Sequence, residues 1–223
     1  QRLAAGAAQD VVVTYTVSDG TASSTATLTI TVTGVNDAPT AVNDTTSAVL
    51  EGAAAPLTGT VASNDSDIDD AATRTYSIAT AVAGLTFNAD GSYSFDASNA
   101  AYNSLKDGEA KLIVVPYTVT DDQGATATAT LSITVTGVND APVAVADVKS
   151  ANEDASVSGT VASNDSDPDT GATLTYSAPT VAGLTFNNDG SYTFDAANAA
   201  YQHLAAGATQ DVAVPYTVSD GTA

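Results

Sequence analysis

The sequence contains no cysteine, no methionine and no tryptophan. Without cysteine the chain can form neither a disulfide nor a thiolate metal site, and it has no cysteine nucleophile. A chain of this kind that worked outside a cell would need another source of stability. Aromatic residues make up only 6%, and the hydrophobic content relies on Ala and Val, which suits thin sandwiches better than one thick core.

Basic residues are almost as scarce, with 5 Lys and Arg against 26 Asp and Glu, for a formal net charge of -21. This balance excludes nucleic acid and anionic membrane surfaces as partners, because clustered Lys and Arg bind such polyanions. Most acids therefore need a cation or wide spacing. No apolar run approaches the roughly 20 residues of a membrane span, and no signal peptide is visible. We expect a soluble chain without direct membrane insertion.

An internal repeat of about 100 residues, the size of a small β-sandwich, organises what is present. Asn36-Asp37-Ala38-Pro39 returns at residues 139–142, and residues 60–67 return at 160–167. We define copy 1 as residues 1–39, the last part of a repeat, copy 2 as 40–139, a complete repeat, and copy 3 as 140–223. Copy 3 lacks a counterpart of residues 23–33, so we expect the chain to be a window of a longer array.

Strand patterns fill copy 2. Residues 25–33 alternate strictly between Thr and apolar residues, and residues 126–136 repeat the pattern, which is typical of a half-buried antiparallel strand. Residues 85–95 read as a hairpin in which Asp90 and Gly91 supply positive φ angles. We predict strands at 40–48, 56–62, 73–79, 84–88, 92–96, 112–120 and 126–136, with an edge or bulge at Pro116 and a short helix at 99–105. The expected fold is all-β, with tandem immunoglobulin-like antiparallel sandwiches.

This topology brings distant acids together. The loops after the second and sixth strands of copy 2 return to the end where the preceding linker enters. We therefore expect a first junction with Asn36, Asp37, Asp65, Asp67, Asp69, Asp121 and Asp122, and a second with Asn139, Asp140, Asp165, Asp167, Asp169 and Asp220. Glu51 and Glu153 fall in turns at the opposite end of their copies, so Glu51 could complete the second junction.

Such clustered carboxylates would repel one another unless a cation lies among them. The ligands are all oxygen, with no His or Cys nearby, which selects a hard ion, and Ca²⁺ accepts 6–8 oxygens where Mg²⁺ usually keeps waters. Calcium is the predicted ion. An EF-hand is excluded, because loop positions 6 and 12 hold Asp70 and Tyr76 instead of Gly and Glu. The alternative is that these acids only form turns, which explains Asp90 and Asp189 better than metal binding does.

Three motifs in fixed order carry a family resemblance: residues 85–95, the Tyr15-Thr-Val-Ser-Asp-Gly20 segment, and the Gly34-Val-Asn-Asp-Ala-Pro39 segment. Together they resemble the VCBS-type, cadherin-like repeat of giant bacterial surface adhesins. The resemblance implies calcium-binding linkers at Asn36, Asp37, Asn139 and Asp140. It also implies a cell-surface or secreted protein, exported by a type I system, whose repeats form a stalk for adhesion and biofilm formation.

The residues give less support to other functions. Catalysis is disfavoured, because the single histidine, His203, is replaced by Arg2 and Ser104 in the other copies. The Thr row of residues 25–33 could form an ice-binding or carbohydrate-binding face, but the solvent side of an ordinary strand explains it more simply. The missing strand of copy 3 suggests another possibility. Identical chains could polymerise into a fibre if residues 23–33 of one chain completed copy 3 of the next.

Overall fold

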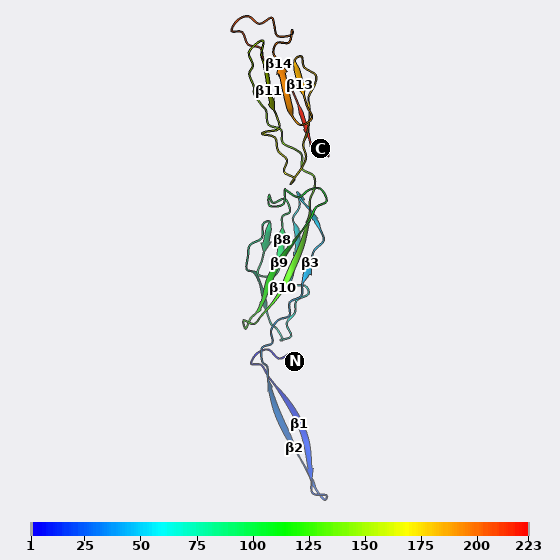
Figure 1. Ribbon diagram of the computed structural model, residues 1–223. Helices are drawn as coiled ribbons and strands as arrows, with labels where there is room; N and C mark the ends of the chain where they lie inside the picture. Colours follow the sequence, from blue (N-terminus) through cyan, green and yellow to red (C-terminus); the bar gives the residue numbers. More distant parts are fainter. Residues whose placement is uncertain (1, 223) are drawn as a thin grey trace. The chain divides into compact units, whose positions relative to one another are not determined.

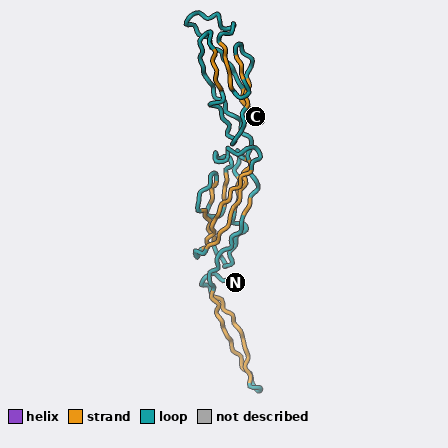
Figure 2. The backbone as a smooth tube through the Cα atoms, in the orientation of Figure 1, coloured by secondary structure: helices purple, strands orange, loops and turns teal. Residues whose placement is uncertain are grey.

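The structure is a computed structural model that describes residues 2–222, and within that range it contains strands, turns and loops but no helix (Figures 1 and 2). The expected all-β fold is confirmed. The short helix expected at residues 99–105 is wrong, because this segment forms successive turns, and the Leu105 N–H bonds the Tyr102 carbonyl only three residues earlier. Residues 2–222 hold no helix that is long and apolar enough to span a membrane.

The described chain divides into two compact units. Unit 1 comprises the residues up to Val49, with Ala53–Asn99 and Leu112–Val135. Unit 2 comprises Leu50–Gly52, Ala100–Lys111 and the residues from Thr136 onward. The turns at one end of copy 2 therefore group with copy 3. As a result, each of the two acidic clusters described below lies within a single unit.

In unit 1, copy 1 forms a two-stranded hairpin of β1 (Ala8–Ser18) and β2 (Ser23–Thr33). The two strands pair along their full length, from Ala8 with Thr33 to Ser18 with Ser23. Every residue of both strands is exposed, including the apolar face of β2 that the alternation predicted to be buried. Copy 1 contains only the last part of a repeat, and within the described residues no second sheet lies over the hairpin, so that expectation is not tested for this strand.

Copy 2 forms two facing sheets, with strand orders β3-β10-β9-β6 and β5-β8-β7, and β4 also pairs with β10. The strands lie close to the predicted ranges. They are β3 (Asp44–Thr45), β4 (Val49–Leu50), β5 (Leu57–Thr60), β6 (Arg74–Ile78), β7 (Leu85–Phe87), β8 (Ser92–Phe95), β9 (Ala110–Asp121) and β10 (Thr126–Thr136). One pair departs from the antiparallel expectation, because β10 runs parallel to β3.

The core of copy 2 follows the predicted alternation. Ala129, Leu131, Ile133 and Val135 of β10 are all buried, and they share the interior with Phe95. An apolar residue at every second position thus faces the opposite sheet, as a half-buried strand requires.

Pro116 lies in β9 and Asp90 lies in the turn between β7 and β8. Pro116 fits a local edge, because β6 pairs only with Tyr117–Asp121 of β9 and leaves the preceding residues without a neighbour on that side. Between β7 and β8 only Gly91 has a positive φ, of 83°. Asp90 instead accepts the N–H and hydroxyl of Ser92, at 2.9 and 2.6 Å. This turn-forming role is the one expected for Asp90.

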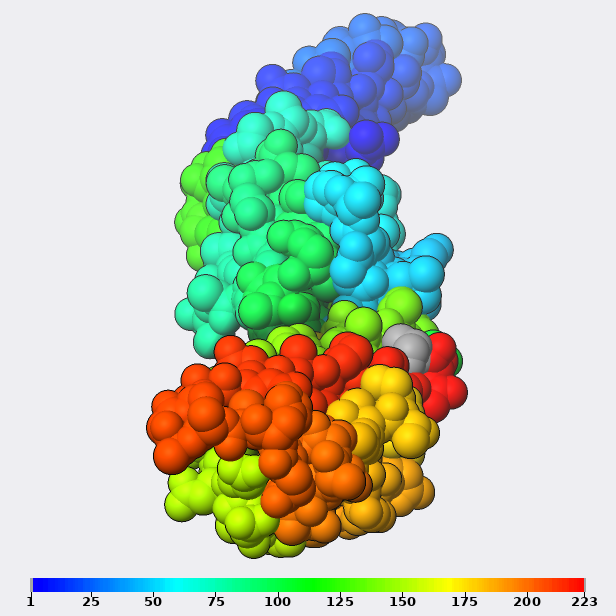
Figure 3. Space-filling view, turned by 90° about the horizontal axis from the view of Figure 1, so that it is seen from above, coloured from blue at the N-terminus to red at the C-terminus, as the bar shows by residue number. Residues whose placement is uncertain are grey.

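In unit 2, copy 3 repeats part of this architecture. One sheet contains β11 (Ser156–Thr160), β14 (Ser191–Asp195) and β13 (Leu184–Phe186), and a second contains β12 (Thr175–Ser177) and β15 (Thr217–Ser219). Figure 3 shows the orange-to-red segment, which includes residues 200–216, at the surface. Residues 200–216 contain only turns and loop, whereas the counterpart of residues 209–216 in copy 2 belongs to strand β9.

Candidate functional site

The first acidic cluster forms where the linker between copies 1 and 2 meets the loop after β5. Thr40 and Ser66 form an isolated antiparallel bridge, with N–H to carbonyl distances of 2.7 and 3.0 Å. Three residues from each side of this bridge, Asp69 Oδ2 accepts the backbone N–H of Asp37 at 2.9 Å. The acidic loop therefore holds the linker by its main chain.

The loop after β9 reaches the same linker. Asn36 donates its side-chain N–H to Asp121 Oδ2 at 2.9 Å, and Asp121 is only 6% exposed. Asp121 Oδ1 also accepts the N–H groups of Gln123 and Ala125. The hydrogen bond from Asn36 is the main cause that lowers the pKa of Asp121, and the loop amides add to it. Asp121 is thus held as a carboxylate beside the linker.

Two carboxylates of this cluster keep an oxygen without a partner. Asp67 Oδ1 accepts the N–H of Asp69 at 2.9 Å, but Asp67 Oδ2 and Asp69 Oδ1 are buried and have no hydrogen-bond partner. A buried carboxylate oxygen with nothing to neutralise or solvate it is costly. These two atoms are where a cation would be most stabilising.

The structure does not bring every predicted residue to this point. Asp122 is exposed, and its side chain accepts a hydrogen bond from Gln123 instead. Asp65 is buried but turned toward the sandwich, where Oδ1 accepts the Val42 N–H at 2.7 Å. The Asp65 carboxylate also lies 3.3 Å from the Tyr117 hydroxyl.

Tyr117 contacts both Asp44 and Asp65 on the side of the sandwich, and the sequence pattern did not predict these contacts. The Tyr117 hydroxyl lies 2.9 Å from both Asp44 Oδ2 and the Val42 carbonyl. Burial raises the pKa of Asp44, and the nearby charge of Asp65 adds to the rise. Burial likewise raises the pKa of Tyr117, with both carboxylates contributing. The recurrence of Pro-Tyr-Thr-Val at residues 116–119 and 215–218, and of Val-x-Asp at 42–44 and 145–147, was the available signal.

The second acidic cluster lies in unit 2 and repeats the bridge, the linker hydrogen bond and the unpartnered oxygens of the first. Val143 and Ser166 form the same isolated bridge, and Asp169 Oδ2 accepts the backbone N–H of Asp140 at 3.1 Å. Asp167 Oδ1 accepts the Asp169 N–H at 2.8 Å. Asp167 Oδ2 and Asp169 Oδ1 are again buried without a hydrogen-bond partner. The loop and linker therefore have the same local geometry in copy 2 and in copy 3.

Glu51 belongs to this second cluster. It is 8% exposed, and neither of its carboxylate oxygens has a hydrogen-bond partner of normal geometry. Burial raises the pKa of Glu51, the Val138 backbone partly offsets this rise, and the charges of Asp140 and Asp169 then raise the pKa further. The turn after β4 therefore adds an acidic side chain next to carboxylates that already lack neutralisation.

The remaining predicted residues have different surroundings. Asp165 Oδ1 accepts hydrogen bonds from the Val145 N–H and the Tyr216 hydroxyl, so it matches Asp65, although its Oδ2 is buried without a hydrogen-bond partner. Burial, followed by the hydrogen bond and charge of Asp165, raises the pKa of Tyr216 to about 12. The Asn139 side chain donates a hydrogen bond to the Asp140 carbonyl. Asp220 Oδ1 accepts the backbone N–H of Thr222, and Glu153 is exposed.

The donor atoms of both clusters are of the kind that a hard cation binds. The unsatisfied atoms are carboxylate oxygens, and no softer ligand is near. Within residues 2–222, however, no three Asp, Glu or His side chains are already grouped closely enough to form a complete ion site. Coordination would need the carboxylates to move closer together, with further oxygen donors such as Asn side chains and main-chain carbonyls.

Comparison with known proteins places this geometry in a family. The model of the bacterial cadherin-like domain matches residues 36–137 and 139–223, so the chain belongs to the bacterial cadherin-like domain family. Each matched segment begins at or beside one of the two Asn-Asp-Ala-Pro linkers, so each match pairs a linker with the sandwich that follows it. No curated protein matches the sequence.

Among solved structures, the PcdhgB3 EC1-4 fragment aligns with a TM-score of 0.54 and 14% identity, over 88% of this chain and 50% of that one. The protocadherin GammaB4 extracellular domain aligns with a TM-score of 0.50 and 18% identity, over 86% of this chain and 32% of that one. The chain therefore spans half or less of the length of these structures. At such low identity, the similarity is one of fold.

Proposed function

We propose that this chain is a segment of a calcium-rigidified extracellular stalk, in which tandem cadherin-like sandwiches space a bacterial surface adhesin away from the cell. The observation that carries the proposal is the pair of buried, unpartnered carboxylate oxygens in each cluster, on a loop that also holds the linker. If the acidic loop did not contact the linker, the simpler interpretation would be that its acids only form a solvated turn.

The chain's own residues would hold the ion and the linker together. In unit 1 the candidate ligands are Asn36, Asp37, Asp67, Asp69 and Asp121, and in unit 2 they are Glu51, Asn139, Asp140, Asp167, Asp169 and Asp220. The bound ion would supply the positive charge that five Lys and Arg cannot. With the repulsion cancelled, the loop and linker would keep one relative orientation.

Contacts that involve no carboxylate ligand would assist the ions. The Asp70 N–H bonds the Arg2 carbonyl at 2.9 Å in unit 1, and the Thr170 N–H bonds the Ser104 carbonyl at 3.1 Å in unit 2. In both cases the donor directly follows the third acid of the loop. Calcium would therefore stiffen a contact that already exists, and extracellular modules bind it at about 10⁻⁴ to 10⁻³ M.

The family supports an adhesion-type role over catalysis, because cadherin-like domains are a non-enzymatic, generally extracellular fold. Neighbouring repeats are the partners that this role needs. The VCBS-type adhesin class, secretion by a type I system and a part in biofilm formation rest on the motifs at residues 85–95 and 34–39, and complete the proposal.

Thermal unfolding tests the proposal when it is measured once in chelator and once with calcium at about 5–10 times the dissociation constant of extracellular modules. We expect calcium to raise the melting temperature clearly, Mg²⁺ at the same concentration to raise it less, and small-angle scattering to show a longer, stiffer particle with calcium. Coincident melts together with identical scattering profiles would overturn it.

A further inference from the structure

The first acidic loop (residues 64–70) and the second (residues 164–170) are followed by different residues at one equivalent position. Arg74, at the start of β6, follows the first loop, and Leu174 takes its place after the second. β6 pairs with β9 so that Arg74 lies opposite Asp121. In copy 3 the pairing of β12 with β15 begins directly after Leu174 and ends directly before Asp220. Copy 2 therefore carries a positive charge where copy 3 carries an apolar side chain.

The Arg74 guanidinium is held against the main chain of the first acidic loop. Its Nη1 donates a hydrogen bond to the carbonyl of Asp65, two residues before Asp67. Arg74 is only partly exposed, and it forms no ion pair with a carboxylate among residues 2–222. Because no single carboxylate binds the guanidinium, its positive charge acts on the loop as a whole.

The charge of Arg74 also acts in the interior beside the loop. Burial raises the pKa of Tyr76, and the charge of Arg74 is the largest effect that opposes this rise. The charges of Asp65 and Asp44 add to the rise. A partly buried charge is screened less by water and salt than a charge on the surface. Arg74 therefore offsets part of the negative charge that gathers at this end of copy 2.

The other basic residue at the first loop does not change this difference. Arg2 Nε lies 3.4 Å from Asp70 Oδ1, and the two side chains are 79% and 61% exposed. Exposed ion pairs contribute little, because water and salt screen them. Asp70 is also the acid that the second loop lacks, since Thr170 stands at its position. Arg2 and Asp70 thus cancel in charge, and Arg74 is the charge by which the two loops differ.

The second loop has only an exposed lysine beside it. A Cβ at Gly171 would lie 3.5 Å from Lys106 Nζ, so the ammonium is near the end of this loop. Lys106 is exposed and makes no ion pair within residues 2–222. A hydrated ammonium on a flexible side chain is a weaker local charge than an anchored guanidinium. Leu174 therefore leaves the second loop without a charge comparable to that of Arg74.

We propose that Arg74 is a built-in counter-ion that lowers the calcium affinity of the first acidic loop, and that Leu174 leaves the second loop free of this effect. The inference rests on the proposed calcium binding and names a residue that tunes it. The guanidinium and a bound calcium ion repel each other, because both are positive and share one loop. Successive junctions of one stalk would then stiffen at different calcium concentrations.

Without calcium the same guanidinium has the opposite effect. It stabilises the loop in chelator, because it offsets the repulsion among the carboxylates. Loss of Arg74 should therefore weaken the calcium-free fold and strengthen calcium binding. A merely structural role would weaken both, so the opposite signs identify an effect of charge.

Exchange of the two residues tests the proposal, because each is the natural residue at the equivalent position of the other copy. Arg74→Leu and Leu174→Arg are made in the full chain, and the backbone amide signals of Asp37 and Asp140 are followed by NMR during a calcium titration. Each of these N–H groups bonds the third acid of its own loop, so each reports one loop. We expect Arg74→Leu to lower the calcium midpoint at Asp37 roughly three- to tenfold, as for one charge acting on a divalent ion through a partly screened medium. Leu174→Arg should raise the midpoint at Asp140 by a similar factor.

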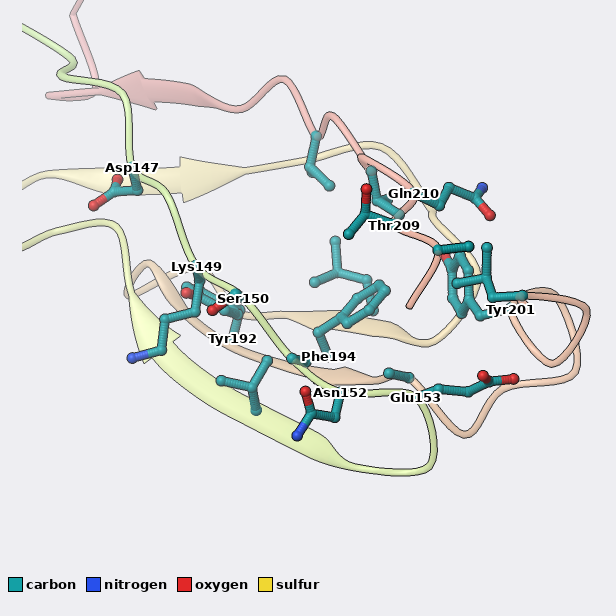
Figure 4. Close-up of a pocket in the computed structure, with 18 of the residues that line it drawn as sticks. Asp147, Lys149, Ser150, Asn152, Glu153, Tyr192, Phe194, Tyr201, Thr209 and Gln210 are labelled. Atoms are coloured by element: carbon teal, nitrogen blue, oxygen red, sulfur yellow. The ribbon is translucent and has the colours of Figure 1, made fainter. Parts of the chain in front are cut away.

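Further variants separate the charge of Arg74 from its hydrogen bond. Arg74→Lys keeps the charge and should keep the natural midpoint at Asp37. Arg74→Gln keeps an N–H donor without the charge and should behave as Arg74→Leu does. Lys149→Gln removes the same charge from an exposed residue beside the pocket shown in Figure 4, and should leave both midpoints unchanged.

Urea unfolding in chelator provides the second readout. Arg74→Leu should unfold at lower urea than the natural chain, and Leu174→Arg at higher urea. If Leu174→Arg does not fold, Arg74→Gln decides the question. An Asp37 midpoint that is unchanged or raised in Arg74→Leu and Arg74→Gln overturns the inference and leaves the proposed function intact. Amides that do not respond to calcium in the natural chain overturn both.

Discussion

The carboxylate of Asp69 accepts the backbone N–H of Asp37 at 2.9 Å, and Asp169 accepts that of Asp140 at 3.1 Å in the same way. In each case the third acid of an acidic loop uses one oxygen to hold the linker and keeps the other buried without a partner. One side chain therefore couples the linker to the place where positive charge is missing.

Replacing Asp69 with Asn separates these two roles. The amide oxygen of Asp69→Asn can still accept the Asp37 N–H, but the negative charge is lost. We expect the melting temperature in chelator to stay level or rise, because carboxylate repulsion falls, and the rise produced by calcium to shrink.

The matched control is Asp90→Asn, which alters a carboxylate that only caps the turn at Ser92. Its calcium response should equal that of the natural chain. The double variant Asp69→Asn with Asp169→Asn should lose most of the response. An undiminished response in the double variant would show that these loops do not bind the ion.

The repeat period and the strand alternation were enough to predict the architecture and the meeting of loop and linker. They could not show which way each carboxylate turns. Asp65 and Asp67 are two residues apart in one loop, yet Asp65 faces Tyr117 while Asp67 keeps an oxygen free of partners. That difference depends on the Tyr117 hydroxyl and the Val42 N–H, which approach from distant strands.

Within the described residues, copy 1 has only the last two strands of a repeat, so no second sheet covers the apolar face of β2. β2 and β10 have almost the same residues, but β10 is buried on one face and β2 is exposed throughout. Strand alternation reports which side chains share a face, and it says nothing about whether a second sheet covers that face.

Glu51 gives the stability of unit 2 a predictable dependence on pH. Its pKa in the folded chain is raised above the ordinary 4.5, mainly by burial. The folded state then binds the proton more tightly than the unfolded state, so stability falls as pH rises from 4.5 through the raised value. Glu51→Gln should remove this part of the fall.

The measurement is urea unfolding in chelator at several pH values from 4 upward, with the exposed Glu153→Gln as the control. Glu153→Gln should leave the pH profile unchanged. With calcium present, the natural chain should lose the fall, because a cation would favour the ionised carboxylate. If the profiles of the Glu51→Gln and natural chains are parallel in chelator, burial of this carboxylate has no effect on stability.

We expect Tyr117 to stabilise copy 2 independently of calcium. Tyr117→Phe removes the hydroxyl beside Asp44, Asp65 and the Val42 carbonyl, and leaves two carboxylates close together in a buried place. We expect a loss of about 1–3 kcal/mol in the free energy of unfolding, measured with urea in chelator.

The loss should be smaller at low pH, where protonated Asp44, whose pKa is raised, can donate a hydrogen bond in place of the tyrosine. Tyr93→Phe is a suitable comparison, because Tyr93 is also buried in copy 2 and its hydroxyl bonds no carboxylate among the described residues. An equal loss for both variants at every pH would indicate that only packing is involved.

Gly137 begins the second linker and has no room for a side chain. A Cβ at this position would lie 2.2 Å from the Lys106 carbonyl oxygen and 2.7 Å from that of Leu105, both of them backbone atoms. The Gly137 N–H bonds the Glu109 carbonyl at 2.8 Å, and the Gly108 N–H bonds the Gly137 carbonyl at 3.1 Å, so the strand end is held on both sides. Gly137→Ala must therefore displace the backbone of unit 2 where the linker starts.

We expect Gly137→Ala to reduce the free energy of unfolding by about 1–3 kcal/mol through overpacking. Gly108→Ala is the control for backbone conformation, because Gly108 has a φ of 71° and open space around it. Its cost should be about 1–2 kcal/mol and should arise from φ alone. Since the Gly137 clash also shifts the start of the linker, only Gly137→Ala should weaken the calcium response. A weakened response in Gly108→Ala as well would place the effect in the 105–109 loop instead of the linker.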